Sequence, residues 1–275
     1  MRGQPTGEKA VLKGYTLPRS PTGRSSLAPR PPWHYAGDCL AVEFEADADA
    51  VRALLPSALE FESPRCCAYF VEWQYSTDEG EEPLDPVNSQ YKESIFLLSA
   101  RFRGESVAFC PFIWVDQDVS LMRGLIQGWP KQIGSTWITR AYPLAGKAAP
   151  QHAPGGRFGA SLAVKDRRLV DARVTLFEPW TSLPRPSFDK AVNVRLFPNL
   201  ARGLHDKPAL FELVRLKSRD VRVGAIMKGE ATLFFHDHPR VELSMLRPRT
   251  VGSGYRFSFA LTVDDLETLL DLQEH

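Results

Sequence analysis

Apolar and polar residues alternate along most of the chain from residue 39 onward. Between Leu40 and Phe44 every second residue is large and apolar, which is the period of a strand with one buried face. Glycine in the short link 103–105 separates two such runs and is typical of a hairpin. The same period, or a short apolar run, predicts further strands over 66–75, 93–102, 106–115, 136–142, 160–165, 169–177, 191–197, 210–217, 225–235, 241–246 and 255–261.

Helical patterns are few and short. Asp47 and Asp118 stand where an N-terminal cap is expected, and Pro56 and Gly128 mark the ends of the helices that follow them. The predicted helices cover 48–55, 119–127 and, at the end of the chain, 264–273. Strands and helices do not alternate, which argues against a parallel sheet. We therefore expect a mainly β (α+β) fold, a single large antiparallel β-barrel or cone-like domain with a few short helices.

Residues 1–36 differ from the rest of the chain. They contain six prolines and four glycines, a composition that excludes a helix and disfavours a central strand. We expect an extended N-terminal arm over 1–36, which packs on its own body or on a neighbouring subunit, and a β-barrel domain over 37–275. A disordered basic tail is the alternative for the arm, but it leaves unexplained the apolar residues Tyr15, Leu17, Leu27, Trp33 and Tyr35.

Composition and charge narrow the class of protein. The 275 residues are 43% hydrophobic and 24% charged, with a formal net charge of +1, as in ordinary globular proteins. Near-neutral charge argues against a general binder of nucleic acid or membrane surfaces. No apolar run approaches the roughly 20 residues of a membrane helix, and no apolar secretory segment opens the chain. Four cysteines without CxxC spacing indicate free or buried thiols, so we expect a cytoplasmic protein.

Several signature motifs of common enzyme classes are missing. The chain has no GxGxxG after a strand, no GxxxxGK[ST], no GxSxG and no HExxH. The best metal candidate is His236 with His238, because two histidines one residue apart can share a strand face. They adjoin Pro239, however, and no further Cys/His cluster completes four ligands. We interpret them as part of a polar loop and expect neither a metal nor a cofactor.

The segment VSLMRGLIQGWPKQIG, residues 119–134, is the most informative one. On a helix, Arg123 and Gln127 share a face because they are four residues apart. The Gly-Trp-Pro triplet then ends the helix and presents Lys131 beside the apolar bulk of Trp129. A lysine after a helix C-terminus interacts favourably with the helix dipole. The alternative is a desolvated lysine, whose pKa is lowered.

The GWPKQIG segment resembles the catalytic lysine motif of the acetoacetate decarboxylase superfamily, with Lys131 at the Schiff-base position. The segment YKES at 91–94 lies at the family's usual distance upstream and puts Glu93 at the position of its essential glutamate. The block PPWHYAGDCLAVEFEADADAVRALLPSALEF resembles the family's first strand and short helix. The block PALFELVRLKSRDVRVGAIMKGEATLFF resembles a later strand pair. The resemblance runs from about residue 15 to 260.

This resemblance implies imine chemistry inside a β-barrel cavity. Lys131 would attack a substrate ketone and lose water, and the protonated imine would accept electrons from a neighbouring carbanion. Glu93 would be the general acid or base. Attack requires a neutral amine, which implies a lowered pKa for Lys131. Trp129 would contribute to the substrate site beside the lysine.

The chain departs from the family prototype at two positions. Gln132 stands where the prototype has a second lysine, and Gly37 stands where it has an arginine. Conversely, Arg123, Gln127 and Tyr91 resemble residues of divergent members that bind α-keto acids. Some of those members catalyse aldol condensation with dehydration rather than decarboxylation. The likeness implies that Arg123 holds a substrate carboxylate and that Gln127 and Tyr91 position polar substrate oxygens.

Three functions follow as hypotheses. The first, which the family resemblance slightly favours, is a lyase that decarboxylates acetoacetate or a related β-keto acid. The second joins an α-keto acid such as pyruvate to an aldehyde by aldol condensation and dehydration through the same lysine. The third is a non-catalytic barrel that binds an apolar small molecule, which leaves Lys131, Glu93 and Arg123 without a shared purpose. For partners we expect a small keto acid and further copies of this chain in a homo-oligomer, and neither nucleic acid nor membrane.

Overall fold

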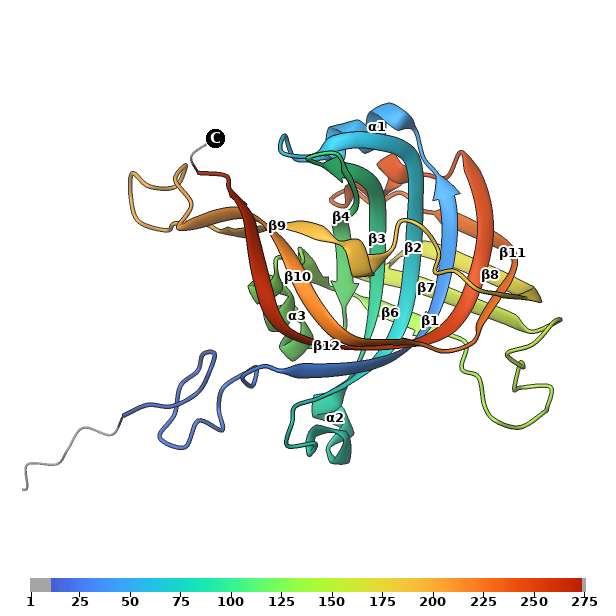
Figure 1. The fold of residues 1–275 in the computed structure, drawn as a ribbon, viewed down its shortest axis with the longest axis horizontal. Coiled ribbons are helices and arrows are strands. Elements are labelled where there is room, and N and C mark those ends of the chain that lie inside the picture. The colour runs from blue at the N-terminus through green and yellow to red at the C-terminus, as the bar shows by residue number, and fades with distance from the viewer. Residues whose placement is uncertain (1–10, 274–275) are drawn as a thin grey trace, which may run out of the picture.

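The computed structural model describes residues 11–273 (Figure 1). Twelve strands dominate this part of the chain, so the prediction of a mainly β fold is confirmed. They are β1 (Trp33–Glu45), β2 (Glu60–Ser76), β3 (Gln90–Phe102), β4 (Glu105–Val115), β5 (Lys131–Ile133), β6 (Ser135–Ile138), β7 (Arg157–Val164), β8 (Arg167–Trp180), β9 (Val192–Phe197), β10 (Leu210–Val223), β11 (Ile226–Phe235) and β12 (Thr250–Asp271).

Short helices connect some of these strands. The α-helices are α1 (Ala48–Leu54), α2 (Pro86–Ser89) and α3 (Asp118–Gln127). Three 3₁₀ turns cover Glu82–Leu84, Phe188–Lys190 and Glu242–Leu246. Asp47 caps α1 as predicted, because its carboxylate accepts the backbone N–H groups of Asp49 and Ala50.

All twelve strands belong to one strongly curled sheet, visible in Figure 1. Its order is β5-β4-β3-β2-β1-β12-β11-β8-β7-β6, and β10 pairs with both β12 and β9. The pairs are antiparallel except β4 with β5. Within the described residues β5 and β6, the two ends of the path, do not pair, so the expected closure of a barrel is not complete. The seam lies at Gly134, the one residue between them, whose N–H donates to the carbonyl of Val115.

Two of the predicted elements are wrong. The segment 264–273 is not a helix, because β12 continues to Asp271 and pairs with β10 there. The pairing contains bulges, as between Leu213 and Val214, which interrupt strict alternation and produce an apolar spacing like that of a helix. The segment 241–246 is a 3₁₀ turn instead of a strand.

The sheet buries both of its faces. Leu40, Val42 and Phe44 point into one apolar core, while Cys39 and Ala41 point into a second one. Trp73, Tyr91 and Trp129 belong to the second core, which therefore contains the segment singled out in the sequence. All four cysteines are buried and unpaired with one another, and burial raises the pKa of Cys66 to about 12.

Residues 11–32 precede β1 as an irregular segment that projects from the body in Figure 1. Thr16 and Ser26 hydrogen-bond across a loop of this segment, with an Oγ1–Oγ distance of 3.0 Å. Ala28 at its end is fully buried, whereas Val11 and Leu17 are 78% and 72% exposed. Residues 1–10 of the expected arm lie outside the described residues. The division into an arm and a domain stays a prediction.

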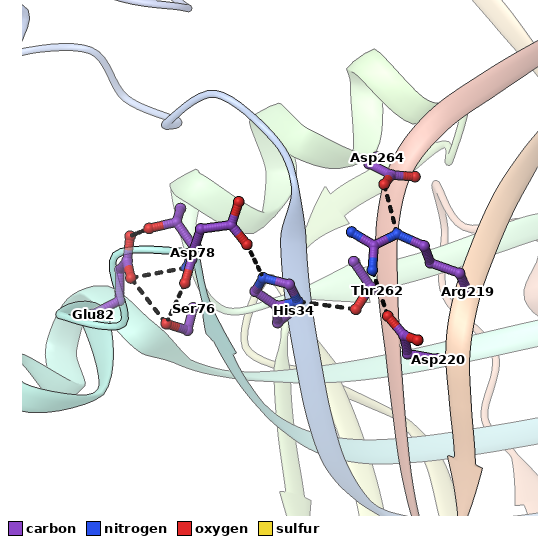
Figure 2. A network of polar contacts seen from close by, with 9 residues as sticks. His34, Ser76, Asp78, Glu82, Arg219, Asp220, Thr262 and Asp264 are labelled. Atoms are coloured by element: carbon purple, nitrogen blue, oxygen red, sulfur yellow. Dashed lines mark hydrogen bonds and ion pairs between the residues drawn. The ribbon is translucent and has the colours of Figure 1, made fainter.

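A polar network ties the loop after β2 to the outside of the sheet (Figure 2). His34 on β1 joins Asp78 through Nε2 at 2.8 Å and Thr262 on β12 through Nδ1 at 2.9 Å. Arg219 on β10 pairs with Asp264 and Asp220 beside it. His34 therefore links β1 to both of its neighbouring segments on the face opposite Trp33 and Tyr35. No helix within residues 11–273 has the length and apolar character needed to cross a membrane.

Candidate active site

Lys131 emerges from a tight turn at the end of α3. Gly128 ends the helix in the left-handed region, with φ of 83°, and the N–H of Trp129 donates to the carbonyl of Gly124. The chain then reverses into β5, and the lysine side chain lies back across the helix. Its Nζ is 2.7 Å from Oε1 of Glu93 and 3.0 Å from Oγ of Ser120, with only 7% of the side chain exposed.

Gly124 makes room for this lysine. A Cβ at position 124 would lie 2.2 Å from Cδ of Lys131, closer than atoms can approach. Ser120, one turn earlier on the same buried face of α3, provides the hydroxyl that the ammonium group contacts. Neither residue was predicted from the sequence as a site residue, although both fall on the helix face shared by Arg123 and Gln127.

Glu93 lies on β3 between Tyr91 and Ile95, on the face that points into the second core. Its Oε2 accepts a hydrogen bond from Nε1 of Trp73 on β2, at 2.8 Å. The indole lies against Gly37 of β1, where a Cβ would fall 2.5 Å from the ring. No side chain larger than hydrogen fits at position 37 beside Trp73, which accounts for the departure from the family prototype there.

The surroundings of Lys131 favour its neutral form. Burial lowers the pKa of Lys131, and the charge of Arg123 acts in the same direction, although Glu93 opposes both through its charge and its hydrogen bond. The net effect is a pKa below that of an exposed lysine. The proton of the ammonium group also has an acceptor at hand, the Glu93 carboxylate.

Arg123 is buried in an aromatic enclosure next to the lysine. Its guanidinium carbon lies 3.5 Å from the ring centre of Tyr75, 5.3 Å from that of Tyr35 and 5.6 Å from that of Tyr91. Only 1% of the residue is exposed, and its guanidinium nitrogens have no hydrogen-bond partner among residues 11–273. A buried cation without hydrogen bonds is costly, and the ring contacts offset only part of that cost, so the guanidinium would gain from pairing with an anion.

A cavity of about 70 Å³ opens beside Lys131 and Glu93. Of the residues predicted from the sequence, Tyr91, Gln127 and Trp129 also line it, whereas Arg123 is not a lining residue and lies next to two that are, Tyr35 and Tyr91. Tyr35 connects the cavity with the aromatic enclosure of Arg123. It lines the cavity, its ring faces the guanidinium, and its hydroxyl oxygen lies 3.4 Å from Nε2 of Gln127. The lining residues that the sequence analysis did not name as site residues are Tyr35, Trp73, Ile95, Ile113, Phe188, Asp189, Ala191, Leu216, Ser218, Leu261 and Val263.

His236 and His238 do not line this cavity. Nε2 of His236 lies 2.8 Å from Oδ2 of Asp171 on β8, and Nδ1 of His238 accepts the N–H of Arg240. Among the described residues, no three His, Cys, Asp or Glu side chains are grouped so that they would hold a metal ion.

Comparison with known proteins identifies the family. The model of the acetoacetate decarboxylase family, described as "Acetoacetate decarboxylase (ADC)", matches residues 16–272. The chain belongs to this family. The resemblance found in the sequence is thereby confirmed, and the expectation of an enzyme is supported because the family's named members are enzymes.

Three proteins similar to this chain are informative. An acetoacetate decarboxylase of Chromobacterium violaceum is 24% identical over 268 residues, 96% of each chain. The enduracididine biosynthesis enzyme MppR, solved with the condensation product of pyruvate and imidazole 4-carboxaldehyde, is 38% identical with a TM-score of 0.88, over 97% of this chain and 100% of that one. An acetoacetate decarboxylase-like enzyme from Sphingomonas wittichii RW1 is 25% identical with a TM-score of 0.87, over 94% of this chain and 100% of that one.

Proposed function

We propose that this protein joins a small α-keto acid of the pyruvate class to an aldehyde, by aldol condensation and dehydration through an imine on Lys131. The observation that carries the proposal is the buried guanidinium of Arg123, which has no hydrogen-bond partner within residues 11–273 and lies beside a lysine with a lowered pKa. Tyr35 and Tyr91, which line the cavity, lie next to the guanidinium, and a carboxylate that displaces these rings would form charge-assisted hydrogen bonds with Arg123. Such binding stabilises the carboxylate, which suits a reaction that retains it better than one that releases it as carbon dioxide.

The chemistry begins with the Lys131–Glu93 pair. Transfer of the ammonium proton to the carboxylate, across 2.7 Å, gives the neutral amine that attacks the keto carbon. The resulting carbinolamine takes a proton, loses water and becomes an iminium ion. Glu93 then removes a proton from the carbon next to the iminium carbon, which yields an enamine.

The enamine supplies the new carbon–carbon bond. Its nucleophilic carbon attacks the aldehyde carbon, and the aldehyde oxygen takes a proton. Loss of a second proton from the nucleophilic carbon, together with the hydroxyl group, releases water and leaves an unsaturated iminium ion. Hydrolysis frees Lys131, so that keto acid and aldehyde give an unsaturated keto acid and one water.

Decarboxylation of a β-keto acid is the second candidate, and it was the first choice from the sequence. It uses the same imine, and the acetoacetate decarboxylase of Chromobacterium violaceum, 24% identical over 268 residues, favours it. The condensation is preferred because identity is higher, 38%, to MppR, whose solved complex contains a product of pyruvate condensation. A non-catalytic barrel is disfavoured because it would not need a lysine with a lowered pKa.

Borohydride trapping tests the proposal. The purified protein is incubated with pyruvate or with acetoacetate, reduced, and analysed by intact and peptide mass spectrometry, with Lys131→Gln as control. We expect a pyruvate adduct on the peptide that contains Lys131, and an absorbing unsaturated product once an aldehyde is added. Carbon dioxide release from acetoacetate, without condensation, would support the decarboxylase instead. Absence of any adduct would reject both reactions.

A further inference from the structure

We infer that the aldehyde partner carries an apolar side group, aliphatic or aromatic, and not a polar heterocycle. This inference rests on the proposed function and extends it to the second substrate.

The polar groups that would react with the keto acid or bind it gather on one side of the cavity. Glu93 is on β3, Lys131 begins β5 and Gln127 ends α3, and β5 and α3 lie beside β4. Each of these groups already has a use in imine formation or in keto-acid binding. The keto acid therefore occupies this side, and the aldehyde must approach from the other.

The other side is an apolar wall formed by four residues, Phe188, Leu216, Leu261 and Val263. Leu261 and Val263 are on β12, which is separated from β3 in the sheet by β1 and β2. Three strand spacings amount to about 14 Å along the sheet. A group attached to the aldehyde carbon, when that carbon meets the enamine, points toward this wall.

The wall is held in place by packing and by hydrogen bonds. The ring of Phe188 packs edge-on against Phe259 at 4.6 Å and Tyr69 at 5.1 Å between ring centres. The hydroxyl of Tyr69 lies 3.0 Å from the carbonyl oxygen of Pro184 and 2.8 Å from that of Pro186, which fixes the loop before Phe188. Because the wall is fixed, it favours an apolar group on the aldehyde. Its side chains do not rearrange to form hydrogen bonds with a polar group.

Within the described part of the chain, two polar residues adjoin this wall, Ser218 and Asp189. Asp189 is exposed, so water solvates its carboxylate. An imidazole-type aldehyde would place its ring against leucine and valine side chains, where a nitrogen finds a hydrogen-bond partner only if it reaches Ser218 or Asp189 at the edge of the wall, and this weakens binding of the transition state. An apolar group would gain from burial on the same surface.

Competition between two aldehydes tests the inference. With saturating pyruvate, kcat/KM is measured for benzaldehyde and for imidazole 4-carboxaldehyde. Each value is divided by the rate at which the same aldehyde condenses with pyruvate when a free amine is the catalyst, which corrects for the intrinsic reactivity of the aldehyde. We expect benzaldehyde to be preferred by at least about tenfold, the effect of one mismatched apolar contact. Equal values, or a preference for the imidazole, would overturn the inference.

A matched pair of variants locates the preference. Leu261→Asn should reduce the ratio at least about fivefold, while Leu200→Asn, at a leucine that is 93% exposed and outside the cavity lining, should not change it. Leu216→Asn replaces Leu261→Asn if the latter does not fold. An unchanged ratio in a folded wall variant would contradict the assignment. Pyruvate trapping without aldehyde separates the two proposals: a missing adduct rejects the proposed function, whereas a normal adduct with no apolar preference rejects only this inference.

Discussion

Gly124 and Lys131 are in direct contact, because the lysine side chain crosses the helix at the position where any other residue would have its Cβ. The Cβ of an alanine at 124 would lie 2.2 Å from Cδ of Lys131, 2.6 Å from Cγ and 2.7 Å from Cε. The Lys131 side chain can therefore point toward Glu93 and Ser120 only because residue 124 of α3 is a glycine. Glycine in the interior of a helix ordinarily destabilises the helix relative to alanine, so α3 is less stable than it would be with alanine at this position.

Gly124→Ala should separate stability from reactivity. The lysine is flexible and would yield to the new methyl group, so we expect a folded protein whose helix gains up to about 1 kcal/mol in propensity. The displaced Nζ would lose its position beside Glu93, and the rate of pyruvate trapping should fall at least about tenfold, since a small misplacement of a reacting group is costly. Trapping kinetics and thermal unfolding measure the two effects.

Gly146→Ala is the matched control, because a Cβ at position 146 would have its nearest neighbouring heavy atom at 3.9 Å and would not clash. It should leave trapping as in the natural sequence. A Gly124→Ala protein that forms the adduct at the unaltered rate would show that the lysine does not need this path across the helix.

Glu93→Gln should change the pH dependence of trapping in a defined direction. Glu93 raises the pKa of Lys131, so its neutral replacement should lower that pKa further. The amine then stays neutral to lower pH, and the midpoint of the trapping rate should move down. Turnover should nevertheless fall by about 10²–10⁴, because the proton-transfer steps lose their acid and base.

The pH profile of trapping and the steady-state rate of condensation measure these two effects of Glu93→Gln. Glu72→Gln is the control, since Glu72 lies on the neighbouring strand and pairs with Arg140 instead of the lysine. A midpoint that moves up, or turnover equal to that of the natural sequence, would remove Glu93 from the proposed role.

Trp73→Phe should weaken the orientation of Glu93 without emptying the space over Gly37. The phenylalanine ring keeps the apolar contact but has no N–H, so Oε2 loses the 2.8 Å hydrogen bond. Hydrogen bonds to charged groups contribute about 1.5–3 kcal/mol, and we expect kcat to fall about tenfold with little change in KM for pyruvate. A changed KM with kcat preserved would indicate that Trp73 binds substrate and does not position Glu93.

Features of the fold and of the site that depend on residues close together in the sequence could be predicted from the sequence alone. The break after α3 and the strand face shared by Tyr91 and Glu93 depend on neighbouring residues, and the motif around Lys131 is contiguous. Trp73 could not be associated with Glu93 because their contact depends on the register of β2 on β3, in which Val71 lies opposite Glu93. Register is set by packing of the whole sheet and by its turns.

The same physical reason explains the error at the C-terminus. Bulges in the pairing of β10 with β12 shift the inward positions, so that Leu266, Leu269 and Leu270 have helix-like spacing within a strand. Similarly, Leu261 and Phe188 join the cavity only because β12 and the loop before β9 meet the face that carries Tyr35 and Trp73. Nothing near either residue in the sequence indicates that contact.

Arg123→Met should distinguish carboxylate binding from a structural role of the guanidinium. Methionine fills the aromatic enclosure with a neutral chain of similar length. We expect KM for pyruvate to rise about 10- to 100-fold, because a charge-assisted pair with the carboxylate is lost. Stability should stay equal or increase, since replacing a buried cation without hydrogen bonds by an apolar group is often stabilising.

Acetone provides the internal control for Arg123→Met, because it forms an imine but has no carboxylate. Arg123 lowers the pKa of Lys131, so its removal should raise that pKa and move the trapping midpoint up. Above this midpoint acetone trapping should match that of the natural sequence, while pyruvate trapping stays impaired. If both ketones were impaired equally there, or if KM for pyruvate were unaltered, Arg123 would not be the carboxylate ligand, and the preference for an α-keto acid would lose its main support.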